Sequence, residues 1–217
     1  MPAMSAPPSA ASLQRVEAAR YALLRRMTVA MRDHMVAQLQ PIAPAARQMQ
    51  QRLQDAPSDV QAIAGDMAQL HGFARNAVAA NLDMVSWLAP EAGATATVDA
   101  GAGDCLGLLG DHLRDHGWTV RLEPGAGLPV PRHALRTVLA AVLLALADEK
   151  RAPAELVLRP EGTRLRLRWR SAPDAAAGVA PPSYRPLAWE DAQALAAAEE
   201  VQMEHSEDAM DLRFPPP

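Results

Sequence analysis

Two groups of side chains have residue types and spacings that could support chemistry. His112 and His116 lie one helical turn apart, with Asp111 and Asp115 beside them, a spacing that suits a metal site on a helix. No third ligand follows at a fixed spacing, and the two histidines flank an apolar stripe. We therefore expect histidines at the edge of a core, without a bound metal.

The second group is a run of alternating arginines. Residues 164–170 read RLRLRWR, which predicts a strand with one arginine face and one apolar face. A solvated outer face of a sheet is the simpler interpretation. A docking stripe for an acidic partner or for nucleic acid phosphates is the alternative. The sequence contains neither a GxSxG nucleophile motif nor a Walker loop.

Composition narrows the class of protein. Hydrophobic residues make up 49% and charged residues 21%, which is typical of a globular chain. The net charge of -4 makes nucleic acid an unexpected partner, because phosphate binding normally requires a basic excess. The longest apolar run, 138–147, is far shorter than the roughly 20 residues of a membrane span, so no membrane partner is expected. The N-terminus shows no signal core and Cys105 is the only cysteine, so we expect a cytoplasmic protein.

The first 56 residues predict a loose tail and one long helix. Residues 1–11 lack any periodicity, and Ser12 is the predicted N-cap of the helix. Pro41 and Pro44 predict a kink. The apolar stripe of this helix consists of Leu13, Val16, Ala19, Leu23, Met27, Met31, Met35, Leu39, Ile42, Ala46, Met49 and Leu53.

A second helix is predicted after a turn at 55–57, with Ser58 as its N-cap and Pro90 as the residue that ends it. Two such arms joined by a short turn form an antiparallel hairpin. One hairpin cannot bury both apolar stripes, so we predict a homodimer in which two hairpins form a four-helix bundle. The stripe of the second arm consists of Val60, Ile63, Met67, Leu70, Ala74, Val78, Leu82, Val85 and Leu88.

The remainder of the chain mixes helix and strand patterns. The sequence thus predicts a tail at 1–11, a hairpin domain at 12–90 and a mixed domain at 91–217. The loop at 171–186 is rich in alanine and proline, and PGAGLPVP at 124–131 predicts a turn. Strands are predicted at 95–99, 119–123, 155–159, 163–170, 201–205 and 210–214, and helices at 104–116, 135–146 and 189–200.

This order of elements resembles the catalytic core of sensor histidine kinases over about residues 20–214. In that family a dimerising helical hairpin carries the phosphate-accepting histidine and precedes an α/β ATP-binding domain of the Bergerat type. The resemblance implies an α+β fold, with a long antiparallel hairpin followed by an α/β sandwich of the histidine kinase ATPase type. The stretch that corresponds to the phosphoacceptor motif reads MRDHMVAQLQPI, residues 31–42.

Two registers relate this stretch to the family motif, in which a histidine is followed by an acidic and then an apolar residue. Matching the apolar positions puts Asp33 in the place of the histidine, and the phosphoacceptor is then lost. Taking His34 as the acceptor instead puts Gln38 four residues later, where the family has a polar residue that helps orient phosphoryl transfer. A surface histidine without chemistry is the plain alternative for His34.

The ATP-binding half departs from the family pattern. Ala141 and Ala145 of LRTVLAAVLLALADE stand where the family has two asparagines, one of them a magnesium ligand, and alanine offers no oxygen donor. The segment SAPDAAAG keeps Asp174 and Gly178 of the adenine-binding loop but has Ala176 in the middle. PPSYRPLAWED replaces the glycine-rich lid. We therefore expect no nucleotide cofactor.

The resemblance implies a dimeric histidine phosphotransferase or pseudokinase whose partner is the receiver domain of a response regulator. His34 would carry the phosphoryl group and Gln38 would orient it, while Arg32, Asp33 and Met35 would contact the receiver. One alternative is a binding protein without chemistry that sequesters a regulator through the bundle face. Another alternative is an active kinase with divergent motifs.

Overall fold

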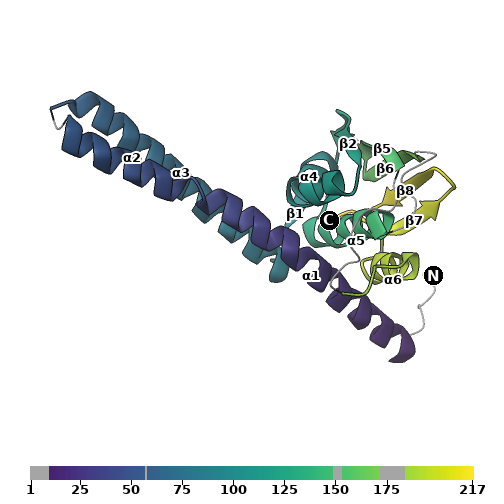
Figure 1. Ribbon diagram of the computed structural model, residues 1–217. Helices are drawn as coiled ribbons and strands as arrows, with labels where there is room; N and C mark the ends of the chain where they lie inside the picture. Colours follow the sequence, from purple (N-terminus) through teal and green to yellow (C-terminus); the bar gives the residue numbers. More distant parts are fainter. Residues whose placement is uncertain (1–9, 57, 149–152, 172–183) are drawn as a thin grey trace. The chain divides into compact units, whose positions relative to one another are not determined.

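The computed structural model describes residues 10–56, 58–148, 153–171 and 184–217 (Figure 1). The chain divides into two compact units, which we describe separately. Residues 29–91 form the hairpin unit, and the residues up to 28 together with those from 92 onward form the α/β unit. Among the described residues, none of the helices combines the length and hydropathy that crossing a membrane requires.

Three helices build the long hairpin: α1 (Ala10–Leu39), α2 (Ile42–Asp55) and α3 (Val60–Leu88). The helix is interrupted where the kink is predicted, because α1 ends at Leu39 and α2 begins at Ile42, after Pro41. Proline has no amide hydrogen to donate, although the backbone of Pro41 keeps helical angles. Pro44 sits in the first turn of α2, where that missing donor costs little.

Both predicted N-caps of the hairpin are wrong. Ser12 lies inside α1, which already includes Ala10. The N-cap of α3 is Asp59 rather than Ser58, and its carboxylate accepts a hydrogen bond of 3.1 Å from the amide of Ala62. An aspartate satisfies an unpaired amide of the first turn as well as a serine does, so neighbouring candidates are hard to separate by sequence.

The apolar stripe predicted for the first arm is partly wrong. The face of α1 and α2 that the hairpin covers includes Gln38 and Arg52, whereas Leu39 and Leu53 are 48% and 45% exposed. Arg52 forms an ion pair of 2.7 Å with Asp66, which is buried on α3. The covered face follows a four-three repeat through Met31, Met35, Gln38, Ile42, Ala45, Met49 and Arg52.

Helix α3 has two apolar faces. The inner face contains Ile63, Leu70, Ala77 and Met84, which are buried or half-buried. Next to the inner face lies a second row of residues that are spaced alternately four and three positions apart. The large apolar residues of this row are 57–72% exposed. We call this row the outer seam of α3; it comprises Val60, Ala64, Met67, His71, Ala74, Val78, Asn81, Val85 and Leu88.

The α/β unit packs three helices on one face of a mixed sheet (Figure 1). The strand order is β2-β5-β6-β8-β7, with β2 parallel to β5 and the other pairs antiparallel. The strands are β2 (Thr119–Leu122), β5 (Pro153–Gly162), β6 (Arg164–Ser171), β7 (Gln202–His205) and β8 (Ala209–Arg213), and β3 (Ala126–Gly127) pairs with β5. The helices are α4 (Val98–Asp115), α5 (Arg132–Asp148) and α6 (Trp189–Ala198), and a small ribbon joins β1 (Thr95–Thr97) to β4 (Pro129–Pro131).

The strands predicted at 155–159 and 163–170 pair as an antiparallel hairpin, although β5 continues through Gly162 and the turn lies at 162–163. The α+β class is confirmed. The predicted start of the helix at Asp104 is wrong, because α4 begins six residues earlier with Thr97 as its N-cap. The turn predicted at 124–131 contains the short strands β3 and β4. Most of the predicted loop at 171–186 lies outside the described residues.

The first part of α1 packs within the α/β unit. Arg26 forms an ion pair with Asp148 at the end of α5, and the two side chains are only 8% and 4% exposed. The other carboxylate oxygen of Asp148 accepts a hydrogen bond of 2.9 Å from the amide of Leu187. The buried carboxylate of Asp148 therefore binds both α1 and the segment before α6 to the end of α5.

His112 and His116 lie near the end of α4, as predicted, with ring centroids 4.2 Å apart. The Nδ1 atom of His116 is 2.7 Å from the carbonyl oxygen of His112. Burial, helped by the neighbouring His116 and Arg26, lowers the pKa of His112 to about 4. Within the described ranges, no group of three or more acidic, histidine or cysteine side chains is arranged to hold a metal ion.

The lowered pKa of His112 predicts a pH-dependent stability. Between pH 6.5 and about 4 the unfolded chain protonates His112 while the folded chain does not, so the free energy of unfolding falls as the pH drops through this window. The variant His112→Asn should show a flatter dependence. Urea midpoints measured at pH 7, 6 and 5 check this, and equal slopes for the variant and the wild type would refute it.

Candidate functional site

The predicted phosphoacceptor lies near the C-terminal end of α1, in the hairpin unit. His34 is half-buried, and no hydrogen bond joins its imidazole to any residue that the structure describes. Gln38 is also half-buried and lies one turn further on, so the two side chains share one side of the helix. An imidazole in this setting keeps a nitrogen lone pair available for a reaction partner.

The other predicted contact residues surround His34. Arg32 and Asp33 are exposed and form an ion pair of 2.8 Å with each other. Met35 is half-buried on the covered face of the hairpin. The carboxylate of Asp33 thus points to solvent with a guanidinium beside it, whereas the imidazole of His34 is partly enclosed.

The apolar surface on α1 lies on the other side of the helix from His34. Val36 and Leu39 are about half exposed. They follow His34 by two and five residues, which places them at least about 140° away around a helix of roughly 3.6 residues per turn. A partner that covers Val36 and Leu39 therefore leaves His34 accessible.

The resemblance places Ala141 and Ala145 at the positions of the family's two asparagines. Both alanines are buried in α5, at 0% and 3% exposed, and neither offers an oxygen donor. Helix α5 contacts α4 on one side and α6 on the other. Asp174, Ala176 and Gly178 lie outside the described residues.

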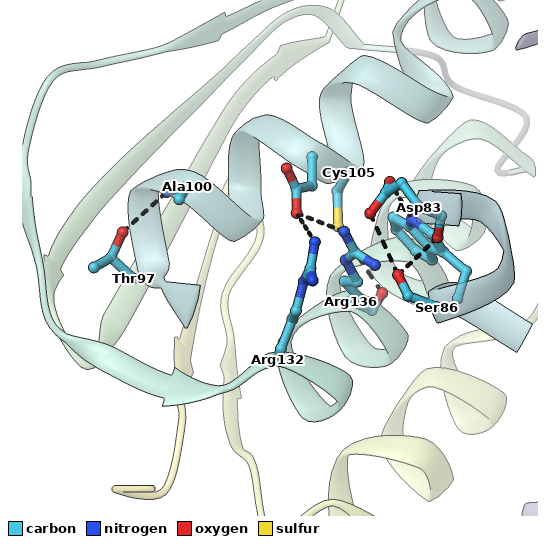
Figure 2. Close-up of polar contacts among 9 residues, drawn as sticks. Asp83, Ser86, Thr97, Ala100, Cys105, Arg132 and Arg136 are labelled. Carbon is cyan, nitrogen blue, oxygen red and sulfur yellow. Dashed lines mark hydrogen bonds and ion pairs between the residues drawn. The ribbon is translucent and has the colours of Figure 1, made fainter. Parts of the chain in front are cut away.

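A charged clamp between α4 and α5 was missed by the sequence interpretation. The carboxylate of Asp104 lies 2.7 Å from a guanidinium nitrogen of Arg136 and 3.4 Å from one of Arg132 (Figure 2). Arg136 has a side chain only 4% exposed. The spacing of Arg132 and Arg136, four residues apart on a helix, is the signal that could have suggested a shared acidic partner. The clamp positions α5 against α4.

A second group missed by sequence lies near the end of α3. Ser86 donates a hydrogen bond of 2.7 Å to the carbonyl oxygen of Asp83 (Figure 2), and the indole nitrogen of Trp87 donates one of 3.3 Å to the Asp83 carboxylate. These contacts join residues three and four apart, so they link side chains on one side of the last turns of α3.

Comparisons with known proteins give structural likenesses only. No protein-family model matches the chain, and no curated protein matches it. The histidine kinase AdeS of Acinetobacter baumannii is 14% identical with a TM-score of 0.41, and the match covers 81% of this chain and 95% of AdeS. A histidine kinase from Burkholderia phymatum STM815 is 15% identical with a TM-score of 0.34, covering 95% of this chain and 97% of that one.

A third structure is that of the histidine kinase ThkA in complex with the response regulator protein TrrA. It is 14% identical with a TM-score of 0.37, and the match covers 94% of this chain and 64% of that one. All three similar structures are histidine kinases. The overlap is loose, because each TM-score stays well below 0.5.

Proposed function

We propose that the protein is a dimeric histidine phosphotransferase of two-component signalling, which carries a phosphoryl group on His34 between receiver domains. The observation that carries the proposal is the half-buried imidazole of His34, without a competing hydrogen-bond partner among the described residues. Its position on a hairpin helix, on the side away from the exposed apolar surface, supports access by a partner. The resemblance of the sequence to sensor histidine kinases points to a receiver domain as that partner.

The proposed reaction needs one nucleophilic nitrogen and no nucleotide. A ring nitrogen of neutral His34 attacks the phosphorus of an aspartyl phosphate on the receiver, a P–N bond forms, and the P–O bond to the aspartate breaks. The aspartate leaves as a carboxylate, and the reverse step delivers the phosphoryl group to a second receiver. The amide of Gln38 helps to orient the phosphoryl oxygens, and the receiver supplies its own magnesium ion.

The packing of α5 supports a pseudokinase rather than an active kinase. A magnesium ion that bridges nucleotide phosphates requires hard oxygen ligands, and the buried positions of Ala141 and Ala145 provide none. The phosphoryl group would then come from a receiver and not from ATP. Calorimetric detection of ATP binding would favour a divergent active kinase.

The outer seam of α3 supports the homodimer. A row of exposed valine, methionine and leucine side chains at four-three spacing is the pattern by which a helix packs on another helix. It lies beside the inner face, as the second buried face of a helix does in a four-helix bundle. Exposed Val36 and Leu39 give α1 a matching surface. A second hairpin of the same chain is the partner that complements both surfaces.

A transfer assay tests the proposal. Incubation with a radiolabelled, phosphorylated receiver domain should label the wild type, and His34→Ala should abolish the label because no other ring nitrogen takes its place. Asp33→Asn is the matched variant one residue away, and it should retain the label. Labelling that survives His34→Ala, or a wild type that stays unlabelled with every receiver of its own genome, would contradict the proposal.

The second candidate is a binding protein without chemistry. The exposed apolar residues Val36 and Leu39 favour it, because they could hold a regulator without any phosphoryl transfer. In this case His34→Ala would leave the affinity for the regulator unchanged, whereas Val36→Glu would weaken it. Titration calorimetry with an unphosphorylated receiver separates the two candidates.

A further inference from the structure

One face of the main sheet, which none of the described helices covers, concentrates arginine side chains. The residues that alternate with them on the same strands, including Leu158, Leu167 and Leu212, are fully buried on the helix-covered face. In a chain with net charge -4, seven of the 21 basic residues share this one face. They are Arg121, Arg159, Arg164, Arg166, Arg168, Arg170 and Arg213, and we call this set the arginine face.

Two pairs within the arginine face oppose like charges across neighbouring strands. Arg159 is directly opposite Arg166, and Arg164 is directly opposite Arg213. Such pairs weaken a sheet, even though Glu161 and Asp211 form ion pairs with Arg159 and Arg166. The same face also carries acidic residues on its strands, namely Glu155, Glu161, Glu204 and Asp211, so seven arginines stand against four acidic residues. The positive excess that remains is complementary to an anionic partner.

Arg168 lies at the centre of the arginine face. Its cross-strand neighbours are Val157 and Ala209, which offer no charge, and no ion pair joins its guanidinium to any described residue. It lines an open cavity of about 840 Å³ together with Arg166, Arg170 and Ser206. Arg168 can therefore offer its planar guanidinium to a ligand without first breaking an existing pair.

We propose that the arginine face binds a carboxylate-rich segment of a protein partner, with Arg168 as its central contact. Arginine pairs with carboxylates through two parallel hydrogen bonds, and the shallow cavity leaves room for an extended segment. Glu155 and Asp208 also line the cavity, so a ligand must place its anions against the arginines rather than beside these two side chains. The net charge of -4 disfavours the long phosphate backbone of nucleic acid, whereas a short acidic segment needs only the local arginines. This surface is independent of His34 and goes beyond phosphoryl transfer.

The experiment uses a fluorescein-labelled peptide of eight glutamates and the chain of 217 residues in low-salt buffer. Fluorescence anisotropy should show binding to the wild type that weakens about tenfold or more in Arg168→Glu. The matched control is Arg114→Glu on α4, an exposed arginine paired only with Asp111 among the described residues, and it should leave the peptide affinity within about twofold. Equal affinities of the two variants would overturn the proposal.

Two further measurements test the central role of Arg168 and the choice of a protein partner. Arg168→Thr should weaken peptide binding without lowering the melting temperature, because threonine suits a strand and the arginine forms no ion pair with the described residues. Tighter binding of an eight-residue thymidine oligonucleotide than of the glutamate peptide would overturn the choice of a protein partner. Retained peptide affinity in Arg168→Thr would overturn the central role of Arg168.

Discussion

Replacing Val78 and Val85 by glutamate is expected to convert the proposed dimer into a monomer. Both valines lie on the outer seam of α3 and are 60% and 57% exposed in the single chain. In a four-helix bundle each glutamate would bury a carboxylate among apolar side chains, which costs several kcal/mol unless the carboxylate is paired. Because about 1.4 kcal/mol is a factor of ten, the dimer dissociation constant should rise by roughly a hundredfold or more.

Sedimentation equilibrium measures this change directly, since one chain has a mass of 23.2 kDa. The matched control replaces Gln69 and Asn76, which are exposed on the opposite side of α3, by glutamate. It adds the same charge to the same helix and should leave the dimer intact. A wild type that sediments as a single chain at micromolar concentration would show that the outer seam has another role.

The second large effect is expected at the buried ion pair of Arg26 and Asp148. In Asp148→Asn the guanidinium of Arg26 stays buried without its counter-charge, and the amide of Leu187 faces a weaker acceptor. Removing one partner of a buried pair costs about 3–5 kcal/mol in the free energy of unfolding. Urea denaturation followed by tryptophan fluorescence measures the loss, because Trp118, Trp169 and Trp189 report on the α/β unit.

Two further variants separate charge burial from simple loss of packing. The double variant Arg26→Met with Asp148→Asn removes both charges together and keeps an oxygen acceptor for the amide of Leu187, so it should recover most of the lost stability. Asp111→Asn breaks the exposed ion pair with Arg114 and should cost less than about 1 kcal/mol. If Asp148→Asn costs no more than Asp111→Asn, the buried pair does not hold α1 to α5.

Helical periodicity predicts the hairpin, but it does not predict which side of each helix faces the other arm. The sequence carries two adjacent apolar repeats on each arm, and a count of apolar residues cannot tell which repeat the hairpin covers. Leu39 and Leu53 were assigned to the covered stripe, yet Gln38 and Arg52 are less exposed. For Arg52 the reason is Asp66, because its buried carboxylate holds the guanidinium through an ion pair between residues of different helices.

The sequence predicts this helix only from residue 104, six residues after α4 begins. Gly101 and Gly103 lower the helix propensity of this stretch. In the structure a Cβ atom on Gly101 would lie only 2.6 Å from a methyl carbon of Leu135. This glycine therefore lets α4 approach α5 closely, a tertiary requirement that local sequence does not reveal.

Only part of the candidate site could be predicted from the sequence. The sequence predicts His34 and Gln38 as neighbours on one helix, and the structure leaves both side chains half-buried on α1. The choice between His34 and Asp33 depends on a register that spacing leaves open, and both residues lie within one turn of α1. Only the chemistry of the labelled residue distinguishes them.

The most direct measurement is to identify the residue that receives the phosphoryl group from a labelled receiver. A P–N bond on His34 survives alkali and is lost in acid, whereas an acyl phosphate on Asp33 is lost in alkali. We expect an alkali-stable, acid-labile label that tandem mass spectrometry assigns to His34. An alkali-labile label on Asp33, or a chain that no receiver labels, would contradict the proposed phosphotransfer.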